Sequence, residues 1–451
     1  MRRKMTKEGR LRKLHRQELP AFLSRLVPDQ TWRGLHTLAE KGMDPRTRWS
    51  PKLIVLCWVV MAWSIQGQLT GRFREGHETL ARMFRGRRRC GKSYQGLTKA
   101  TQRYGVGLFH EFWARLRRSV PRRVGDAWHW YGWVVFAVDG SRIDAPRTVR
   151  NEQEMGKSTR DKSHPTMWIT RLIHLPTRMM WDWRQGPGDS SERAHMQEML
   201  PGLPERSLLV GDIGFGGFDF LRELTESQVA FVIRCGGNST LLVKHTRQEI
   251  ERCGDVRWVY LWPQNRRKEM PLRLRLIVIK RKGKPVYLLT NIESPAQLSR
   301  RMAAEFYRAR WSIEVEFRGL KQTMGHRKVL ARTPEPGEME LAANLAGMAL
   351  LLLYGALVHG AKVARLSLAM ALRAIRQAIE ALRHGETCDW LLGLLREAVT
   401  DEYQRRKPKQ ARDWPHKKSR RPPGPPRLHK LTNAENARIQ KLLIDNGAAF
   451  G

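Results

Sequence analysis

Two apolar stretches of the chain each end in an aspartate. Residues 133–139 are apolar up to Asp139, residues 207–212 are mostly apolar up to Asp212, and a glycine follows each aspartate within two positions. Short apolar runs that are bounded by turn residues are typical of strands buried in a sheet. We therefore expect a buried sheet in which two strands each end in a carboxylate.

The strand pattern continues on both sides of Asp212 and predicts an α/β fold. A helix is expected at residues 218–228, and further strands are expected at residues 168–174, 179–184, 229–234, 240–244, 256–262, 272–280 and 286–290. The last four of these strands lie between about residues 235 and 290, so this stretch is interpreted as a β-rich insertion.

The regions that flank this α/β part are predicted to be helical. Residues 1–125 combine helical apolar spacing with many cations, which favours a DNA-binding region over a helical bundle with a solvated charged face. Residues 126–350 hold the α/β part, and residues 351–404 are helical again. Residues 405–451 form a basic, Pro-rich tail, and the composition of residues 405–430 predicts an extended arm that packs no core.

One apolar run is long enough to cross a bilayer. It extends from residue 341 to residue 361 and contains Asn344, His359 and several glycines. Because of these residues we expect a buried core helix, with a membrane span as the alternative.

The charge of the chain limits its partners. The 451 residues include 83 Lys and Arg against 43 Asp and Glu, a net charge of +40. A charge of this size predicts a polyanionic partner, with duplex DNA as the first candidate and an anionic membrane surface as its rival. The five cysteines are scattered without a C-x-x-C pair, which favours free thiols in a reducing cytoplasm and not a zinc site.

Four polar residues stand at fixed spacing in a segment that is predicted to be helical. At about 100° per residue, Tyr307, Arg310, Glu314 and Lys321 share one arc of roughly 60°, beside an apolar face. Glu316 points the other way, so the geometry selects Glu314 as the acid of this arc. The alternative is a surface helix in which Arg310 and Glu314 form an ordinary ion pair.

Asp139, Asp212 and Glu314 together predict a site for divalent cations. Carboxylates at the ends of two strands and on a helix can converge on Mg²⁺, which prefers oxygen ligands and leaves room for phosphate. Two such ions can promote displacement at phosphorus. Taken singly, Asp139 and Asp212 could each be ordinary turn residues, and Asp144 is a competing acid.

The joint pattern resembles the DDE transposases of the IS4 insertion-sequence family. The matching residues are Asp139-Gly140-Ser141, then Asp212-x-Gly214-Phe215, then Tyr307, Arg310, Glu314 and Lys321. The resemblance covers roughly residues 80–350. It implies an RNase H-like catalytic core with a β-strand-rich insertion, flanked by a helical N-terminal DNA-binding region and a helical C-terminal region that aids dimerisation.

The resemblance also implies the activity and the roles of the six residues. Family members cut donor DNA at the element ends and join these ends to target DNA in a synaptic assembly, with Mg²⁺ or Mn²⁺, and many use a hairpin intermediate. By this resemblance Asp139, Asp212 and Glu314 are metal ligands. Tyr307, Arg310 and Lys321 are contacts to the DNA near the scissile end.

Three further features are relevant to the resemblance. Relatives often carry Asp-Arg-Gly in the second motif, whereas this chain has Ile213 in place of the basic residue. Relatives also use a tryptophan of the insertion to stabilise a flipped base, for which Trp258 and Trp262 are candidates, although core packing is the expected role of both. The stretch Ser191-Glu192-Arg193 is expected to support the site.

The sequence therefore predicts a cut-and-paste DNA transposase. Its expected partners are double-stranded DNA, as element ends and as target, and a second copy of the chain. A cytoplasmic, nucleoid-associated location without a membrane is expected. A catalytically inactive DNA-binding protein derived from a transposase is the first alternative, and a membrane-associated basic protein is the second.

Overall fold

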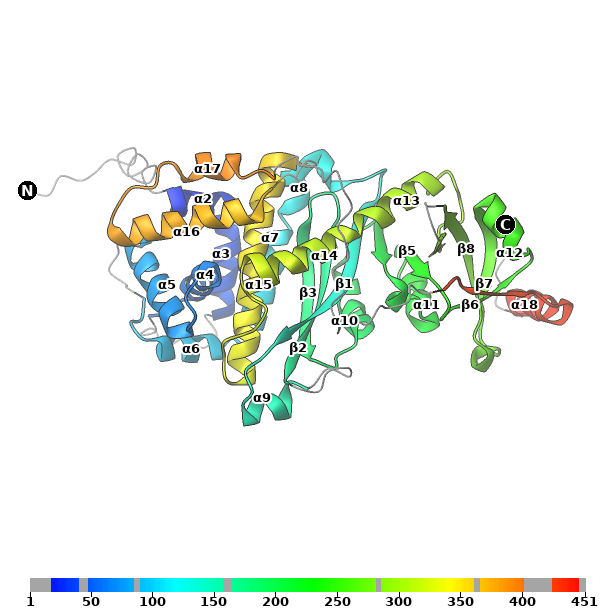
Figure 1. Cartoon of the computed structure of the whole chain (residues 1–451), viewed down its shortest axis with the longest axis horizontal. Coiled ribbons are helices and arrows are strands. Elements are labelled where there is room, and N and C mark those ends of the chain that lie inside the picture. Colours follow the sequence, from blue (N-terminus) through cyan, green and yellow to red (C-terminus); the bar gives the residue numbers. More distant parts are fainter. Residues whose placement is uncertain are drawn as a thin grey trace, which may run out of the picture. The chain divides into compact units, whose positions relative to one another are not determined.

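The computed structural model describes residues 18–39, 48–84, 90–156, 164–280, 285–360, 366–400 and 424–445 (Figure 1). The chain divides into two compact units. The first comprises Met1–Trp128, Gly140–Ser191 and Ser312–Asp401, and the second comprises His129–Asp139, Glu192–Trp311 and Glu402–Gly451. The four consecutive domains expected from the sequence stay a prediction. Arg85–Arg89 of the basic N-terminal run and residues 401–423 of the tail lie outside the described residues.

The first unit is largely helical, as the sequence predicted for residues 1–125. Its helices before the sheet are α2 (Glu18–Leu26), α3 (Asp29–Ala39), α4 (Pro51–Trp63), α5 (Leu69–Met83), α6 (Tyr94–Gln102), α7 (Gly107–Arg117) and α8 (Val120–Val124). Helix α4 begins at Ser50, whose hydroxyl accepts a hydrogen bond from the amide of Leu53, and Pro51 occupies its first turn. Eleven residues of α4 are buried, so this helix forms part of the core.

The C-terminal part of the first unit is organised around one long apolar helix. Helix α15 (Pro334–His359) packs against α4 and strand β3 (Met179–Pro187), and α16 (Leu368–His384) and α17 (Leu391–Glu397) follow it (Figure 1). Within the described residues, α15 is a helix long and apolar enough to cross a membrane, and 89% of its most apolar window is buried inside the structure. The predicted core helix is confirmed.

The strands form one sheet whose neighbours identify the fold. Strand β1 (Val134–Asp144) belongs to the second unit up to Asp139 and to the first unit from Gly140. It is followed in the sheet by β2 (Thr166–His174) and β3 (Met179–Pro187) of the first unit, with the short helix α9 (Val149–Glu154) between β1 and β2 in sequence. In the second unit β1 pairs in parallel with β4 (Ser207–Gly211), and β4 with β5 (Ala230–Cys235). The order β3-β2-β1-β4-β5 is that of an RNase H-like core, so the predicted fold class is confirmed.

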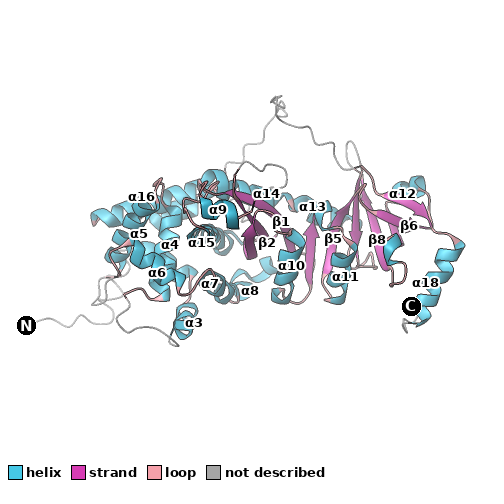
Figure 2. Ribbon diagram, turned by 90° about the horizontal axis from the view of Figure 1, so that it is seen from below, coloured by secondary structure: helices cyan, strands magenta, loops and turns pink. Residues whose placement is uncertain are grey.

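The predicted insertion continues the same sheet. Beyond β5 come β9 (Val286–Thr290), β8 (Leu272–Ile279), β7 (Asp255–Leu261) and β6 (Thr240–Val243), each antiparallel to its neighbour (Figure 2). The helices of the second unit are α10 (Glu192–Met199), α11 (Phe218–Glu226), α12 (Arg247–Cys253) and α13 (Arg300–Ala309). A capping box of Thr246 and Glu249 begins α12.

The structure corrects two boundaries. Strand β1 does not end at Asp139 but continues to Asp144, because Asp144 exchanges backbone hydrogen bonds with Arg327 and Val329. The tail is not an extended arm throughout: residues 427–430 form β10 (Arg427–Lys430), parallel to β6, and α18 (Asn433–Asp445) follows. Backbone pairing and the burial of Ile439 order this segment despite its polar composition.

Candidate active site

Asp139 and Asp212 lie at the same level of two neighbouring parallel strands. In the β1–β4 pair, Val134 is opposite Ser207 and Ala137 is opposite Val210. Continuing this register by two residues sets Asp139 opposite Asp212. Because neighbouring strands are about 4.8 Å apart, the two half-buried carboxylates occupy one edge of the second unit's sheet.

The loop after Asp212 is held by its own side chain and by Arg193. The Asp212 carboxylate accepts a 2.7 Å hydrogen bond from the amide of Gly214 and caps the 3₁₀ turn Ile213–Phe215. Arg193 donates from Nε to the carbonyl of Gly214 at 2.8 Å. A Cβ at position 217 would lie 2.5 Å from Nη1 of Arg193, so Gly217 leaves room for the guanidinium.

These contacts give the Ser191-Glu192-Arg193 stretch a defined place. It begins α10, and a Cβ at position 214 would lie 2.9 Å from the Asp212 carboxylate and 3.7 Å from that of Glu192, so both acids flank Gly214. Although Ile213 replaces the basic residue of many relatives, Arg193 supplies a cation to the same loop.

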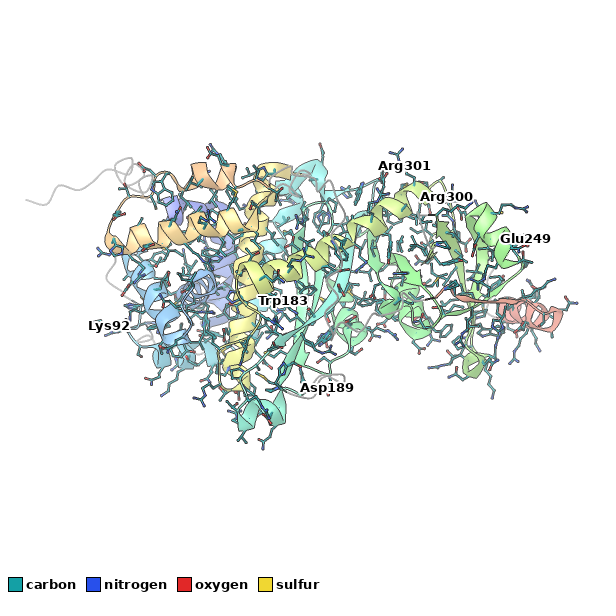
Figure 3. The ribbon with its side chains drawn as sticks, in the orientation of Figure 1. Lys92, Trp183, Asp189, Glu249, Arg300 and Arg301 are labelled. Carbon is teal, nitrogen blue, oxygen red and sulfur yellow. The ribbon has the colours of Figure 1, made fainter. Side chains whose placement is uncertain are left out.

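Two residues of the helical motif lie at this edge of the second unit. Nη1 of Arg310 is 3.9 Å from Oδ2 of Asp139, and its guanidinium lies 5.8 Å from the ring centre of Tyr307. Tyr307 lies in the last turns of α13, and Arg310 is the residue directly after this helix. Arg300 and Arg301 form the start of the same helix (Figure 3). Arg310 is thus placed to partly neutralise Asp139.

The motif does not form the single α-helix that the sequence predicted. Helix α13 ends at Ala309, α14 spans Trp311–Arg318, and residues Gly319–Thr323 form a π-helix. A π-turn has more residues per turn than an α-helix, so the 100° spacing used to place Lys321 does not hold there. Such turns occur frequently at functional sites.

Within the first unit Lys321 reaches the first acidic motif. Its Nζ donates a 2.7 Å hydrogen bond to Oγ of Ser141, two residues after Asp139 in sequence. Burial lowers the pKa of Lys321, and the Asp144 carboxylate opposes that shift. The contact with Ser141 is a role that the motif alone did not reveal, because nothing in a spacing pattern identifies the partner of a side chain.

The two glutamates of α14 have separate roles in the first unit. Glu316 is 2% exposed, and its Oε1 lies 2.6 Å from Nη2 of Arg178. Burial raises the pKa of Glu316, while Arg178 and the buried Arg171 oppose the shift. Glu314 is only half-buried. The prediction that Glu316 points away from the motif arc agrees with its burial.

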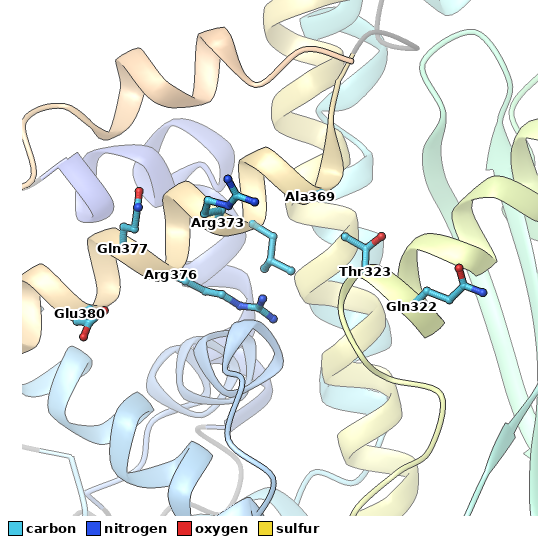
Figure 4. A pocket seen from close by; sticks show the side chains of 8 residues that line it. Gln322, Thr323, Ala369, Arg373, Arg376, Gln377 and Glu380 are labelled. Atoms are coloured by element: carbon cyan, nitrogen blue, oxygen red, sulfur yellow. The ribbon is translucent and has the colours of Figure 1, made fainter. Parts of the chain in front are cut away.

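The π-helix and Gly319 are features that sequence reasoning missed. A Cβ at position 319 would lie 2.8 Å from Cδ2 of Leu368, so glycine permits the start of α16 to approach closely. Gln322 and Thr323 of the π-helix border a cavity of about 480 Å³ beside α16 (Figure 4). A glycine inside a helical pattern was the available signal.

The two candidate tryptophans differ in environment. Trp262 is 3% exposed, donates to the carbonyls of Arg266 and Glu269, and carries the guanidinium of Arg267 at 4.5 Å. The core role expected for Trp262 is confirmed. Trp258 is 44% exposed, at a register shift in β7, with φ of 60°. A positive φ is strained for a bulky residue, so Trp258 is presented to solvent at a cost to the backbone.

The predicted site residues divide between the two units. Asp139, Asp212, Tyr307 and Arg310 belong to the second unit, and Glu314 and Lys321 belong to the first. Among the residues that the structure describes, no three His, Cys, Asp or Glu side chains form a group that could hold a metal ion. The site of three carboxylates stays a prediction.

Comparison with known proteins matches the part of the chain that contains the predicted site residues. The family model described as "Transposase DDE domain" matches residues 130–351, which include all six predicted residues. Residues 130–351 thus match a transposase DDE domain. The resemblance drawn from the motifs is confirmed.

The chain is also similar to a curated relative and to a solved structure. The chain is 23% identical over 224 residues to "Transposase InsG for insertion sequence element IS4" of Escherichia coli (strain K12). That alignment covers 47% of this chain and 49% of the relative, so it spans about half of each protein. A piggyBac transposase, solved as a synaptic complex with hairpin DNA, is 12% identical over 87% of each chain with a TM-score of 0.39. Because this TM-score is low, the fold is assigned from the strand order alone.

Proposed function

We propose that this chain is a transposase that cuts DNA at the ends of an insertion element and joins those ends to target DNA by a cut-and-paste route. The observation that carries the proposal is that Asp139 and Asp212 lie opposite each other on neighbouring parallel strands, in a region that matches a transposase DDE domain. The Arg310 guanidinium beside Asp139 supports it.

The donor set fits Mg²⁺ or Mn²⁺. Carboxylate oxygens are hard ligands, and Asp139 and Asp212 are half-buried, which leaves room for phosphate oxygens. We propose that Asp139, Asp212 and Glu314 hold the metal, which when bound would favour attack of water or a 3′-hydroxyl at phosphorus. Glu314 is the choice on α14 because Glu316 is engaged with Arg178.

The other motif residues bind and orient the DNA in this proposal. Arg310 can hold a phosphate through two parallel hydrogen bonds, and Lys321 can hold one as a point charge. Lys321 also keeps Ser141 in place. The ring of Tyr307 lies 5.8 Å from the guanidinium of Arg310, so it is placed beside the same phosphate. Trp258, as the exposed tryptophan of the insertion, can stack on an unpaired base.

The partners follow from the same chemistry. The net charge of +40 favours double-stranded DNA, both as element ends and as target. The piggyBac relative is described as a synaptic complex with hairpin DNA. We propose that this chain also acts as a homodimer in a synaptic complex, in the cytoplasm near the nucleoid.

The proposal is tested on a supercoiled plasmid that carries the element ends. Purified protein is incubated with Mg²⁺ or with EDTA, and the breaks are mapped. We expect Mg²⁺-dependent breaks at the element ends that Glu314→Gln loses. Binding that shifts the DNA without any break would instead support the catalytically inactive DNA-binding protein.

A further inference from the structure

A groove of the second unit lies next to the Asp212 loop. Its volume is about 620 Å³. One wall is Gly216, Gly217 and Phe218, which follow the Asp212 turn directly, and another is formed by β6 and the end of β7. The far wall comes from the C-terminal segment of residues 424–445. The groove thus joins three parts of the sequence that are about 200 residues apart at most.

The backbone of the C-terminal segment is hydrogen-bonded to the insertion before and after β10. Gly237 donates from its backbone to the carbonyl of Gly424 at 2.9 Å, and Leu431 donates to that of Val243 at 2.9 Å. Between these bonds β10 runs parallel to β6. The segment is therefore an added edge strand and not a free arm.

Side chains fix the segment as well. Ile439 of α18 is fully buried against Leu242, Tyr260 and Trp262. The guanidinium of Arg267 stacks on Trp262 and lies 3.1 Å from the Glu435 carboxylate. These contacts hold α18 on the insertion.

The groove is cationic along the wall that the segment provides. Arg427 and Lys430 are exposed and line it, together with His429. Arg267 lines it from the insertion, and its Nη1 is buried without a hydrogen-bond partner among the described residues. Glu435 is the acid of this lining, and Arg267 neutralises it.

The opposite wall adds further polar groups. Helix α11 begins at Gly217 with no side-chain cap, and Gly217 and Phe218 at its start line the groove, where the start of a helix favours an anion. Asn238, Ser239 and Thr240 line the wall beside it. Cations on one side and amides and hydroxyls on the other match a chain of phosphates better than a single ion.

We propose that this groove binds the phosphodiester backbone of DNA, and that the C-terminal segment is a functional part of the DNA-binding surface. The proposal rests on the proposed function, because DNA is the substrate there. The groove adds a contact tract that starts four residues after Asp212 and is completed by residues near the C-terminus. Its apolar lining residues Trp262 and Phe218 are buried, so the groove holds backbone and does not stack bases.

The test compares two double variants of equal charge. Arg427→Gln/Lys430→Gln removes two cations that line the groove. Arg438→Gln/Lys441→Gln removes two exposed cations of α18 that do not line it. Binding of a fluorescein-labelled duplex of the element end, and of one of its single strands, is measured in EDTA between 50 and 200 mM salt.

Each lost phosphate contact lowers the salt slope by about 0.9 for duplex DNA. We expect the groove variant to have a slope smaller by about 1.8, so that wild-type protein loses about twelvefold more affinity than the variant over this salt range. The control variant should keep the wild-type slope. An equal fall in both variants, or none in the groove variant, would overturn the proposal. The two probes show whether a single strand suffices.

The assay separates this proposal from the proposed function. Binding in EDTA needs no cleavage, whereas the plasmid assay reports breaks. Unchanged slopes with intact Mg²⁺-dependent cleavage would reject the groove and leave the transposase standing. A normal groove effect without any breaks would reject the enzyme and keep the groove.

Discussion

The acids at the strand edge of the second unit and those in the helical core of the first unit have opposite environments. Asp139 and Asp212 are half-buried, and their contacts include a guanidinium at 3.9 Å and a backbone amide. Glu316 and Glu340 are 2% and 1% exposed, and each is paired with an arginine. A half-buried carboxylate can exchange its partners for a metal and phosphate. A buried one cannot do so without breaking its buried ion pair, which is strongly destabilising.

The largest expected effect is on catalysis at the strand edge. Asp212→Asn keeps the side chain's size and hydrogen-bonding oxygen but removes a charge. We expect cleavage to fall by about a thousandfold, or about 4 kcal/mol, while the urea midpoint of unfolding stays at the wild-type value. Asp219→Asn is the matched control, since Asp219 is an exposed acid that pairs with Arg222. Normal cleavage by Asp212→Asn would show that this acid is structural.

The second effect distinguishes the two glutamates of α14. Glu316→Gln removes the buried carboxylate that lies 2.6 Å from Arg178 and also acts on the buried Arg171, which costs about 3–5 kcal/mol of stability. We expect a lower urea midpoint for Glu316→Gln. We expect an unchanged midpoint but lost cleavage for Glu314→Gln. Lost cleavage with an unchanged midpoint for Glu316→Gln, together with a lower midpoint for Glu314→Gln, would contradict the roles given to the two glutamates.

The third effect is a pH dependence from Glu340. Burial raises the pKa of Glu340 to about 7, against the opposing influence of Arg72. The folded state therefore binds a proton more tightly than the unfolded chain, whose glutamates titrate near pH 4.3. The contribution of this group to stability is full below about pH 4.5 and is lost as the pH rises to about 7.

The matched variant for this pH effect is Glu340→Gln, measured by urea unfolding at several pH values. The difference in unfolding free energy between wild type and variant should change by about 3 kcal/mol between pH 4.5 and pH 7. A difference that does not vary with pH would show that Glu340 is charged throughout.

The smallest effect concerns the exposed tryptophan. Trp258→Ala should weaken binding to element ends that contain an unpaired base by about 1–3 kcal/mol, without lowering the urea midpoint, because its side chain is 44% exposed. Fluorescence anisotropy with paired and unpaired ends measures this. Equal losses for both kinds of end would mean that Trp258 does not contact a base.

Much of the fold was predictable because a strand that is buried on both faces has a short run of apolar residues in the sequence. The apolar runs that end at Asp139 and Asp212, and the strands of the insertion, were each found from their own residues. The helical spacing of α14 also separated Glu314 from Glu316, since only Glu316 is buried. The spacing of apolar residues predicts burial correctly where each face of a helix or strand lies in a single environment.

The missed features all depend on contacts between distant residues. β1 continues past Asp139 because of hydrogen bonds to Arg327 and Val329. The π-helix after Gly319 lies where α16 approaches. The C-terminal segment folds because β6 offers a free edge and the insertion offers a pocket for Ile439. None of these partners is near in sequence, so composition predicted an arm where a strand forms.

The central claim is that Asp139, Asp212 and Glu314 hold one metal site. A titration of wild-type protein with Mn²⁺, followed by electron paramagnetic resonance, tests it most directly, with Asp212→Asn, Glu314→Gln and the control Asp219→Asn beside it. We predict that both Asp212→Asn and Glu314→Gln bind Mn²⁺ at least tenfold more weakly, at about 1.4 kcal/mol per tenfold, while Asp219→Asn binds normally. Wild-type affinity in Glu314→Gln, with loss only in Asp212→Asn, would contradict the claim that the acid of α14 belongs to the site.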